Sequence, residues 1–193
     1  MKPLGLRILL PAALVFAVAY ALFSPSLSYS LVNLDDQEFI THNPIIYNGF
    51  SWAGLRSAFT QLHGDQTMYV PLLWISYLLD VKFFSASSAA PWGFHFTNVL
   101  LHAANALLLF LLLVALCRKP WRAFFFAALW AIHPLRVESV AWVTERKDVL
   151  SGFFALLCIG AYVGAHSPEV AVHGNGRPFG RRLLLVVSFA CFL

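Results

Sequence analysis

The fold is decided by the segment Phe96–Cys117, which reads FTNVLLHAANALLLFLLLVALC and carries no charged side chain. A helix that crosses the hydrocarbon core of a bilayer needs about 20 predominantly apolar residues, and this segment meets that requirement. The rest of the chain has the same character, because 60% of its 193 residues are hydrophobic and 11% are charged. An average soluble domain carries about 25% charged residues. We therefore expect an integral membrane protein.

Four further apolar segments are predicted to span the membrane, at residues 6–23, 121–133, 149–165 and 183–193. The first has an alternative interpretation as a secretory signal peptide, because it combines a basic start, an apolar middle and small-residue steps. The last would rise only about 16 Å against a hydrocarbon core of about 30 Å. We therefore expect that span to be incomplete, and the chain to be a truncated piece or a fragmentary reading frame. The predicted fold class is all-α, a polytopic transmembrane helix bundle forming a single domain over residues 1–193.

The charged residues are divided unevenly between the two ends of these spans. The N-terminus, residues 118–122 and residues 165–182 hold eight basic residues and one acid, whereas the other segments hold five basic residues and eight acids. Cytoplasmic loops carry an excess of Lys and Arg, so we expect a cytoplasmic N-terminus. Residues 25–95 then form a large outer loop, in which residues 51–59 and 69–79 are predicted juxtamembrane helices. A sixth crossing by residues 69–79 is the alternative.

Composition argues against two other classes of protein. The formal net charge of +4 does not indicate nucleic-acid binding, because the basic residues are spread among apolar segments and form no single patch. The three cysteines, Cys117, Cys158 and Cys191, show no CxxC spacing. Neither a disulfide framework nor a zinc site is indicated.

The outer loop begins with two adjacent carboxylates, Asp35 and Asp36. A carboxylate close to a membrane exit can serve as a general base or as a ligand for a divalent ion. The alternative is structural, because Asp35 followed by Glu38 has the spacing of a helix capping box. Both roles can hold at once, since each needs only one of the two aspartates.

The second predicted span carries a polar stripe of Asn98, His102 and Asn105. Their spacing places them on one helical face. Polar groups in lipid are costly, so the stripe is expected to face protein or a water-filled cavity. Hydrogen bonding between helices is the structural alternative to a functional role.

The segment His133–Ser151 reads HPLRVESVAWVTERKDVLS and combines charges with a proline directly after a short apolar run. Pro134 is well placed to start a helix, in which Glu138, Trp142 and Glu145 would share one face. Charged backbone at membrane depth is tolerated where it lines a cavity.

Three basic residues of this segment, Arg136, Arg146 and Lys147, lie on the side where the positive-inside rule disfavours them. A lipid phosphate would explain their presence, because arginine holds phosphate in a bidentate fork. The alternative is local ion pairing with Glu145 or Asp148.

Together these motifs resemble the membrane half of the transmembrane-and-tetratricopeptide-repeat (TMTC-like) protein O-mannosyltransferases and their bacterial relatives. The similarity covers residues 24–162, and its most specific part is the segment after His133. The matching residues are Asp35-Asp36, Ile40, Asn43-Pro44, Tyr69-Val70-Pro71-Leu72, Pro91-Trp92-Gly93-Phe94-His95, Asn98-Val99-Leu100-Leu101-His102, His133-Pro134, Glu138, Val140, Arg146, Asp148 and Leu150-Ser151.

This resemblance implies the N-terminal half of a GT-C glycosyltransferase. Such enzymes pass a sugar from a polyprenyl-phosphate carrier to an acceptor, here expected to be a protein hydroxyl, on the outer face of a membrane, here expected to be the bacterial inner membrane. Family members have about twice as many spans and usually a C-terminal array of tetratricopeptide repeats.

The resemblance also implies roles for individual residues. Asp35 is the best candidate for the catalytic base, with Asp36 beside it, and Arg146, Arg136 and Lys147 are candidates for the phosphate of the sugar donor. No metal or other cofactor is expected, because arginine can neutralise the leaving phosphate. Five further residues are expected to line the site: His133, Glu138, Glu145, Asp148 and His102.

A non-enzymatic membrane protein, such as a transporter half or an assembly scaffold, is the rival class. A transporter would favour charged or broken sites near the middle of the membrane. Here the charges gather at the outer face, which favours the enzyme.

Overall fold

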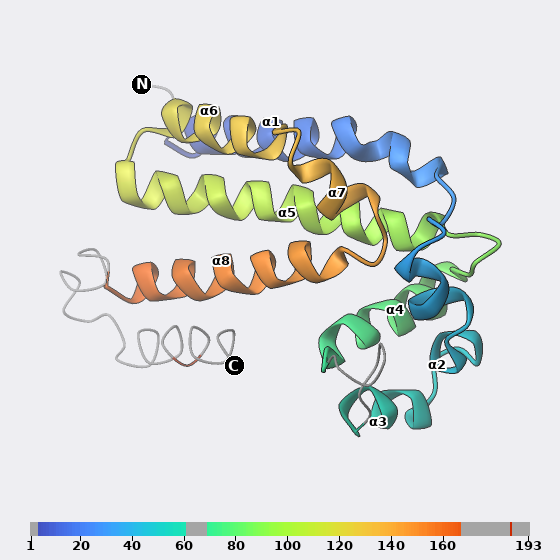
Figure 1. Ribbon diagram of the computed structural model, residues 1–193. Helices are drawn as coiled ribbons and strands as arrows, with labels where there is room; N and C mark the ends of the chain where they lie inside the picture. The colour runs from blue at the N-terminus through green and yellow to red at the C-terminus, as the bar shows by residue number, and fades with distance from the viewer. Residues whose placement is uncertain (1–3, 61–68, 167–185, 187–193) are drawn as a thin grey trace. The chain divides into compact units, whose positions relative to one another are not determined.

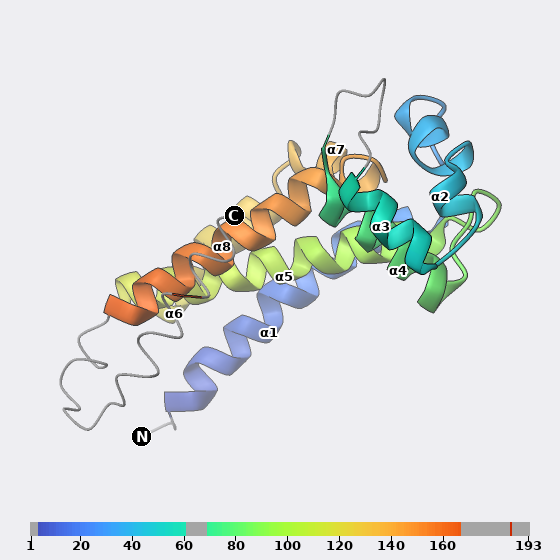
Figure 2. The same cartoon turned by 90° about the horizontal axis from the view of Figure 1, so that it is seen from below.

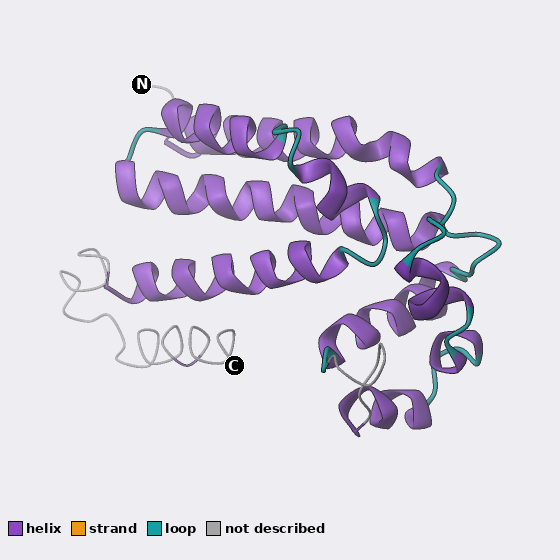
Figure 3. Cartoon of the chain, in the orientation of Figure 1, coloured by secondary structure: helices purple, strands orange, loops and turns teal. Residues whose placement is uncertain are grey.

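The computed structural model describes residues 4–60, 69–166 and 186, and all regular secondary structure in these ranges is helical (Figure 3). The all-α prediction is therefore confirmed. In chain order the helices are α1 (Leu4–Phe23), a 3-10 helix (Ser24–Ser28), a π-helix (Gln37–Thr41), α2 (Pro44–Tyr47), α3 (Trp52–Thr60), α4 (Pro71–Phe84), α5 (Trp92–Cys117), α6 (Pro120–Ala131), α7 (Arg136–Ala141) and α8 (Arg146–His166).

Three segments in the described ranges are long and apolar enough to cross a bilayer: Leu6–Ser28, Trp92–Cys117 and Arg146–His166. They coincide with three of the five predicted spans, as expected for a helical membrane protein. The helix α6 has 12 residues and is not among them, so its crossing stays a prediction. The predicted span at residues 183–193 lies outside the described residues, apart from Val186.

The chain divides into two compact units, which are considered separately. The first consists of Met1–Tyr20, Leu101–His133 and Leu150–Leu193, and the second of Ala21–Leu100 and Pro134–Val149.

The first unit is held together by small residues on α1, α5 and α6, which lie side by side (Figures 1 and 2). Small side chains let helix backbones approach closely. In a membrane the hydrophobic effect does not drive helices together, so this close packing is a main source of helix association. The fully or almost fully buried members of this cluster are Val15, Ala19, Ala103, Ala106, Phe110, Ala123, Ala127 and Ala131.

The polar stripe of α5 faces protein, as predicted, since Asn98, His102 and Asn105 are at most 2% exposed. In the first unit, the Nε2 atom of His102 donates a hydrogen bond to the carbonyl oxygen of Ala131 (2.9 Å), and its ring stacks on Trp130. Hydrogen bonding between helices, the structural alternative, is therefore present at His102.

The second unit has an aromatic core beneath its short helices. Phe39 stacks on Trp74 with ring centroids 5.3 Å apart, and Trp74, Tyr77 and Phe94 follow one another in edge-to-face contacts. Such pairs stabilise a core beyond the burial of their area. The helices α2 and α3 pack on α4, so the predicted helices at residues 51–59 and 69–79 both form and pack together.

The expected helix from Pro134 is shorter than predicted. The helix α7 ends at Ala141, because Trp142 adopts an extended backbone with ψ 123°. Glu138, Trp142 and Glu145 therefore do not share one helical face, and that prediction is wrong. A turn follows, in which the backbone N–H of Arg146 donates to the carbonyl oxygen of Val143 (3.1 Å).

Gly93 allows the first turn of α5 to approach α4. A Cβ atom added there would lie 2.7 Å from the Cβ of Phe84 and 3.0 Å from the Cβ of Ala86. Real Cβ atoms do not approach so closely, so the backbone would have to move.

Gly93→Ala is expected to destabilise the protein by about 1–3 kcal/mol, the usual cost of overpacking, although alanine is the better helix former. Gly160→Ala is the matched control, because a Cβ there meets nothing within 4 Å. The measurement is the thermal unfolding midpoint in detergent. Equal midpoints for the two variants would contradict the close approach at Gly93.

Candidate functional site

Asp36 is a completely buried carboxylate in the second unit. Its Oδ2 atom accepts a hydrogen bond from the backbone N–H of Val32 (2.8 Å). Its Oδ1 atom accepts from the backbone N–H of Thr144 (3.0 Å) and from the Thr144 hydroxyl. Both oxygens are therefore occupied, and Asp36 joins two segments that are 108 residues apart in sequence.

Asp35 is exposed, in contrast to its neighbour. The predicted capping box does not form, because the helical turn that follows is a π-helix with Asp36 at its N-cap position and no side-chain capping bond. Asp36 instead binds the backbone of Val32, which precedes it. The two carboxylates thus have different environments: Asp36 is anchored inside the second unit, and Asp35 is exposed at the surface of that unit.

Arg146 is also completely buried, and protein groups surround its guanidinium. Its Nε donates to Asn98 Oδ1 (2.6 Å), its Nη1 to the Ser76 hydroxyl (3.0 Å) and its Nη2 to the carbonyl oxygen of Phe94 (2.8 Å). Its Nη2 also forms an ion pair with Asp80 Oδ2 (2.6 Å). The ion-pair partner is therefore Asp80 on α4, not the neighbouring Asp148 that local pairing would have used.

Tyr77 completes this arrangement from α4. The Arg146 guanidinium carbon lies 4.4 Å from the centre of the Tyr77 ring, a distance at which a cation is attracted to an aromatic face. The Tyr77 hydroxyl donates to the carbonyl oxygen of Val143 (3.1 Å). Burial raises the pKa of this hydroxyl, so it remains a neutral hydrogen-bond donor.

Asp80 is held from a second side, because the Thr97 hydroxyl donates to its Oδ1 atom (2.5 Å). Charges removed from water need a partner and further hydrogen bonds. Asp80 and Arg146 are each other's ion-pair partner, and the hydrogen bonds come from Thr97 to Asp80 and from Arg146 to its acceptors on α4 and α5. In this geometry Arg146 offers no free fork to a ligand phosphate, since its side chain is enclosed and three of its nitrogens bind protein atoms.

Most of the other predicted site residues occupy less enclosed positions, whereas His102 is fully buried. In the second unit, Lys147 and Arg136 are half-buried and Glu138 is exposed. Lys147 forms the expected local ion pair with Glu145 (2.9 Å), and Asp148 accepts a hydrogen bond from Ser139 (3.0 Å). His133 and His102 belong to the first unit, and His133 is exposed.

Sequence reasoning did not select Asp80, Thr144 or His95 as site residues. His95 is 1% exposed. Its ring meets the Tyr29 ring edge-on, with centroids 6.4 Å apart. An acid in a mostly apolar helix was the available signal for Asp80, whereas Thr144 shows no pattern that could have indicated it.

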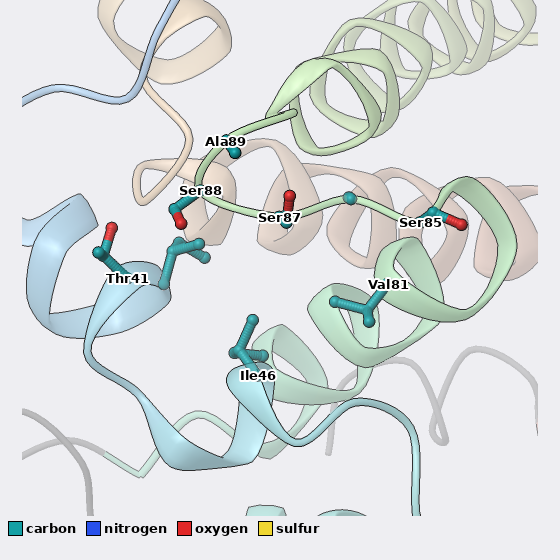
Figure 4. A pocket seen from close by; sticks show the side chains of 9 residues that line it. Thr41, Ile46, Val81, Ser85, Ser87, Ser88 and Ala89 are labelled. Atoms are coloured by element: carbon teal, nitrogen blue, oxygen red, sulfur yellow. The ribbon is translucent and has the colours of Figure 1, made fainter.

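A pocket of about 510 Å³ opens beside the turn that follows Asp36 (Figure 4). Apolar side chains and hydroxyl groups line it, and no charged side chain does so among the described residues. Its lining therefore offers a ligand hydroxyl groups and apolar contacts. The lining residues are Ile40, Thr41, Ile46, Val81, Ser85, Ala86, Ser87, Ser88 and Ala89.

The described residues also contain no group of three His, Cys, Asp or Glu side chains that could hold a metal ion. The fold and this site define the class: an all-α integral membrane protein in which the buried carboxylate of Asp36 is anchored by the turn at residues 143–146.

Comparisons with known proteins identify the family. Protein O-mannosyl-transferase tmtc2 of Xenopus laevis is 34% identical over 121 residues, 63% of this chain and 14% of that protein. Protein O-mannosyl-transferase TMTC2 of Mus musculus is 31% identical over 131 residues, 66% of this chain and 15% of that protein. Protein O-mannosyl-transferase TMTC1 of Mus musculus is 32% identical over 162 residues, 78% of this chain and 16% of that protein.

The chain therefore belongs to a TMTC-like family, as the sequence motifs predicted. It spans 14–16% of the length of these three relatives. No family model matches the chain, and no solved structure matches it.

Arg146 is fully buried and its neighbour Lys147 is half-buried, which allows a direct comparison of their ion pairs. Removing one partner of a buried pair typically costs about 3–5 kcal/mol, because the other charge is left uncompensated. A pair at the protein surface, such as the half-buried pair of Lys147 and Glu145, contributes about 0–1 kcal/mol. Arg146→Ala and Asp80→Ala are therefore expected to unfold at much lower temperature than the natural protein, and Lys147→Ala at nearly the same temperature. Similar midpoints for all three variants would refute the buried pair.

Proposed function

We propose that the chain is part of a membrane glycosyltransferase that transfers a sugar from a polyprenyl-phosphate donor to a protein hydroxyl. The names of its relatives, protein O-mannosyl-transferases, support the reaction class and the acceptor. The observation that carries the proposal is the pair of adjacent carboxylates, in which Asp36 is anchored and Asp35 is exposed. This arrangement presents one free carboxylate on a fixed backbone.

Asp35 is the proposed general base. It removes the proton from the acceptor hydroxyl as that oxygen attacks the anomeric carbon, while the bond from this carbon to the phosphate oxygen breaks. Configuration inverts in a single displacement, and the polyprenyl phosphate leaves. A positioned base typically contributes about 10²–10⁴-fold to such a rate. Asp36 is unsuited to this task, because both its oxygens already accept hydrogen bonds and it is fully buried.

Arg136 and Lys147 are the proposed contacts of the donor phosphate. Both are half-buried and lie in the same folded unit as Asp35. We assign Arg146 a different role, because its contacts with Asn98 and Asp80 leave its guanidinium enclosed. Basic side chains alone can stabilise the charge that develops on the leaving phosphate, so the proposed reaction requires no metal.

The proposed site faces the periplasm, with the chain in a bacterial inner membrane and its N-terminus in the cytoplasm. The support is the excess of basic residues in the N-terminus, residues 118–122 and residues 165–182, which the positive-inside rule places in the cytoplasm.

A topology reporter fused after Arg122 or at Asn175 is expected to report a cytoplasmic location, and one inserted at Gly64 a periplasmic location. The reason is again the charge distribution between the segments. Paired alkaline phosphatase and green fluorescent protein fusions make the measurement. A periplasmic signal from the Asn175 fusion would overturn the orientation.

Asp35→Asn is expected to lower sugar transfer by about 10²–10⁴-fold without changing the thermal unfolding midpoint. Asp36→Asn should instead lower the midpoint, because an amide nitrogen would face one of the N–H groups that the carboxylate now binds, at a cost of about 1–3 kcal/mol. For each variant and for the natural protein, the measurements are the thermal unfolding midpoint and the rate of mannose transfer from polyprenyl-phosphate mannose to a Ser- and Thr-containing peptide.

Glu38→Gln is the matched control, because Glu38 is an exposed acid on the turn that follows Asp35. It should transfer sugar at the natural rate. If Asp35→Asn retained the natural rate, the general-base role would be lost. A rate unchanged in both aspartate variants would favour a scaffold over an enzyme.

A further inference from the structure

The turn at residues 143–146 is fixed from several directions. The Tyr77 hydroxyl and the backbone N–H of Arg146 both donate to the carbonyl oxygen of Val143. Asn98 Nδ2 donates to the carbonyl oxygen of Trp142 (3.1 Å), while its Oδ1 accepts from Arg146. The side chains of α4 and α5 thus hold the backbone of this turn on both sides of Thr144.

Thr144 presents two hydrogen-bond donors from this fixed turn to one atom. Its backbone N–H and its hydroxyl both point to Oδ1 of Asp36. Thr144 is 2% exposed and Asp36 is fully buried, so water does not compete for these bonds. Bonds from neutral donors to a carboxylate are among the stronger hydrogen bonds in proteins.

The other oxygen of Asp36 binds the backbone N–H of Val32. The chain around Asp35 is therefore constrained twice: Val32 lies three residues before it, and Asp36 directly follows it. The exposed carboxylate of Asp35 lies between these two points of attachment. Its position depends on Asp36, and through Asp36 on Thr144.

We propose that Thr144 is a positioning residue that holds the Asp35–Asp36 turn in the geometry that general-base action requires. This inference rests on the proposed function, in which Asp35 is the base. Thr144 does not contact the reacting atoms; its hydroxyl fixes Asp36, and Asp36 fixes the backbone of Asp35. A small displacement of a reacting group can cost about 10²-fold in rate, so the loss of one such contact is expected to affect turnover.

The test compares Thr144→Val, which removes the hydroxyl and keeps the branched shape, with Thr144→Ser, which keeps the hydroxyl. Thr60→Val is the matched control, because the Thr60 hydroxyl is exposed and bonds to the Arg56 carbonyl oxygen within its own helix. Two quantities are measured in lipid nanodiscs, on the natural protein and on each variant. One is the turnover of polyprenyl-phosphate mannose with a Ser- and Thr-containing peptide, and the other is backbone hydrogen exchange over residues 32–41.

Thr144→Val is expected to lower turnover by about 10–100-fold, with little change in the KM of the sugar donor, and to accelerate exchange over residues 32–41. Thr144→Ser and Thr60→Val should match the natural protein in both measurements. If Thr144→Val accumulates poorly, Thr144→Ala replaces it, because it also lacks the hydroxyl and avoids the branched side chain.

Natural turnover in Thr144→Val would overturn the positioning role, even with faster exchange. Unchanged exchange would overturn it as well, because the hydroxyl would then not hold the turn. If the natural protein transferred no mannose at all, the proposed function would fail. The exchange comparison would still decide the structural part: faster exchange supports Thr144 as the group that holds the turn, and unchanged exchange refutes it.

Discussion

The buried guanidinium of Arg146 is the constraint on which the second unit depends. A cation removed from water must find a counter-charge and hydrogen-bond acceptors inside the protein. The unit supplies Asp80 from α4, with Asn98 and the Phe94 carbonyl from α5. Because these groups come from separate helices, satisfying one side chain fixes the helices relative to each other. Replacing such pairs with apolar residues is often neutral or stabilising, so their value here lies in the arrangement that they impose.

The sequence predicted the elements of this fold better than their contacts. Length and hydropathy suffice to predict α1, α5 and α8, because a membrane-spanning helix satisfies its backbone hydrogen bonds internally. The polar stripe of α5 was predicted to face protein, since lipid would penalise it. The Arg146–Asp80 pair could not be foreseen, because its partners are 66 positions apart and nearer acids were available in Glu145 and Asp148.

The same limitation applies to the candidate site. Sequence spacing selected Asp35 and Asp36 but could not distinguish an anchored carboxylate from a free one. That distinction depends on Thr144, which lies more than 100 positions away. The predicted face of Glu138 and Glu145 failed for a local reason, since the extended backbone of Trp142 ends α7. This extended residue leads into the turn in which Thr144 meets Asp36.

The π-helix Gln37–Thr41 carries a further consequence for how this protein can evolve. The backbone N–H of His42 donates to the carbonyl oxygen of Gln37 five residues earlier (2.8 Å), so the turn contains one residue more than an α-helical turn would. Losing one residue there would rotate everything before it by about 100° relative to Asn43 and Pro44. A descendant with a single-codon deletion would therefore keep a regular helix, but its two aspartates would point in a different direction relative to α2. Substitutions, not length changes, are the variation that this turn can accept.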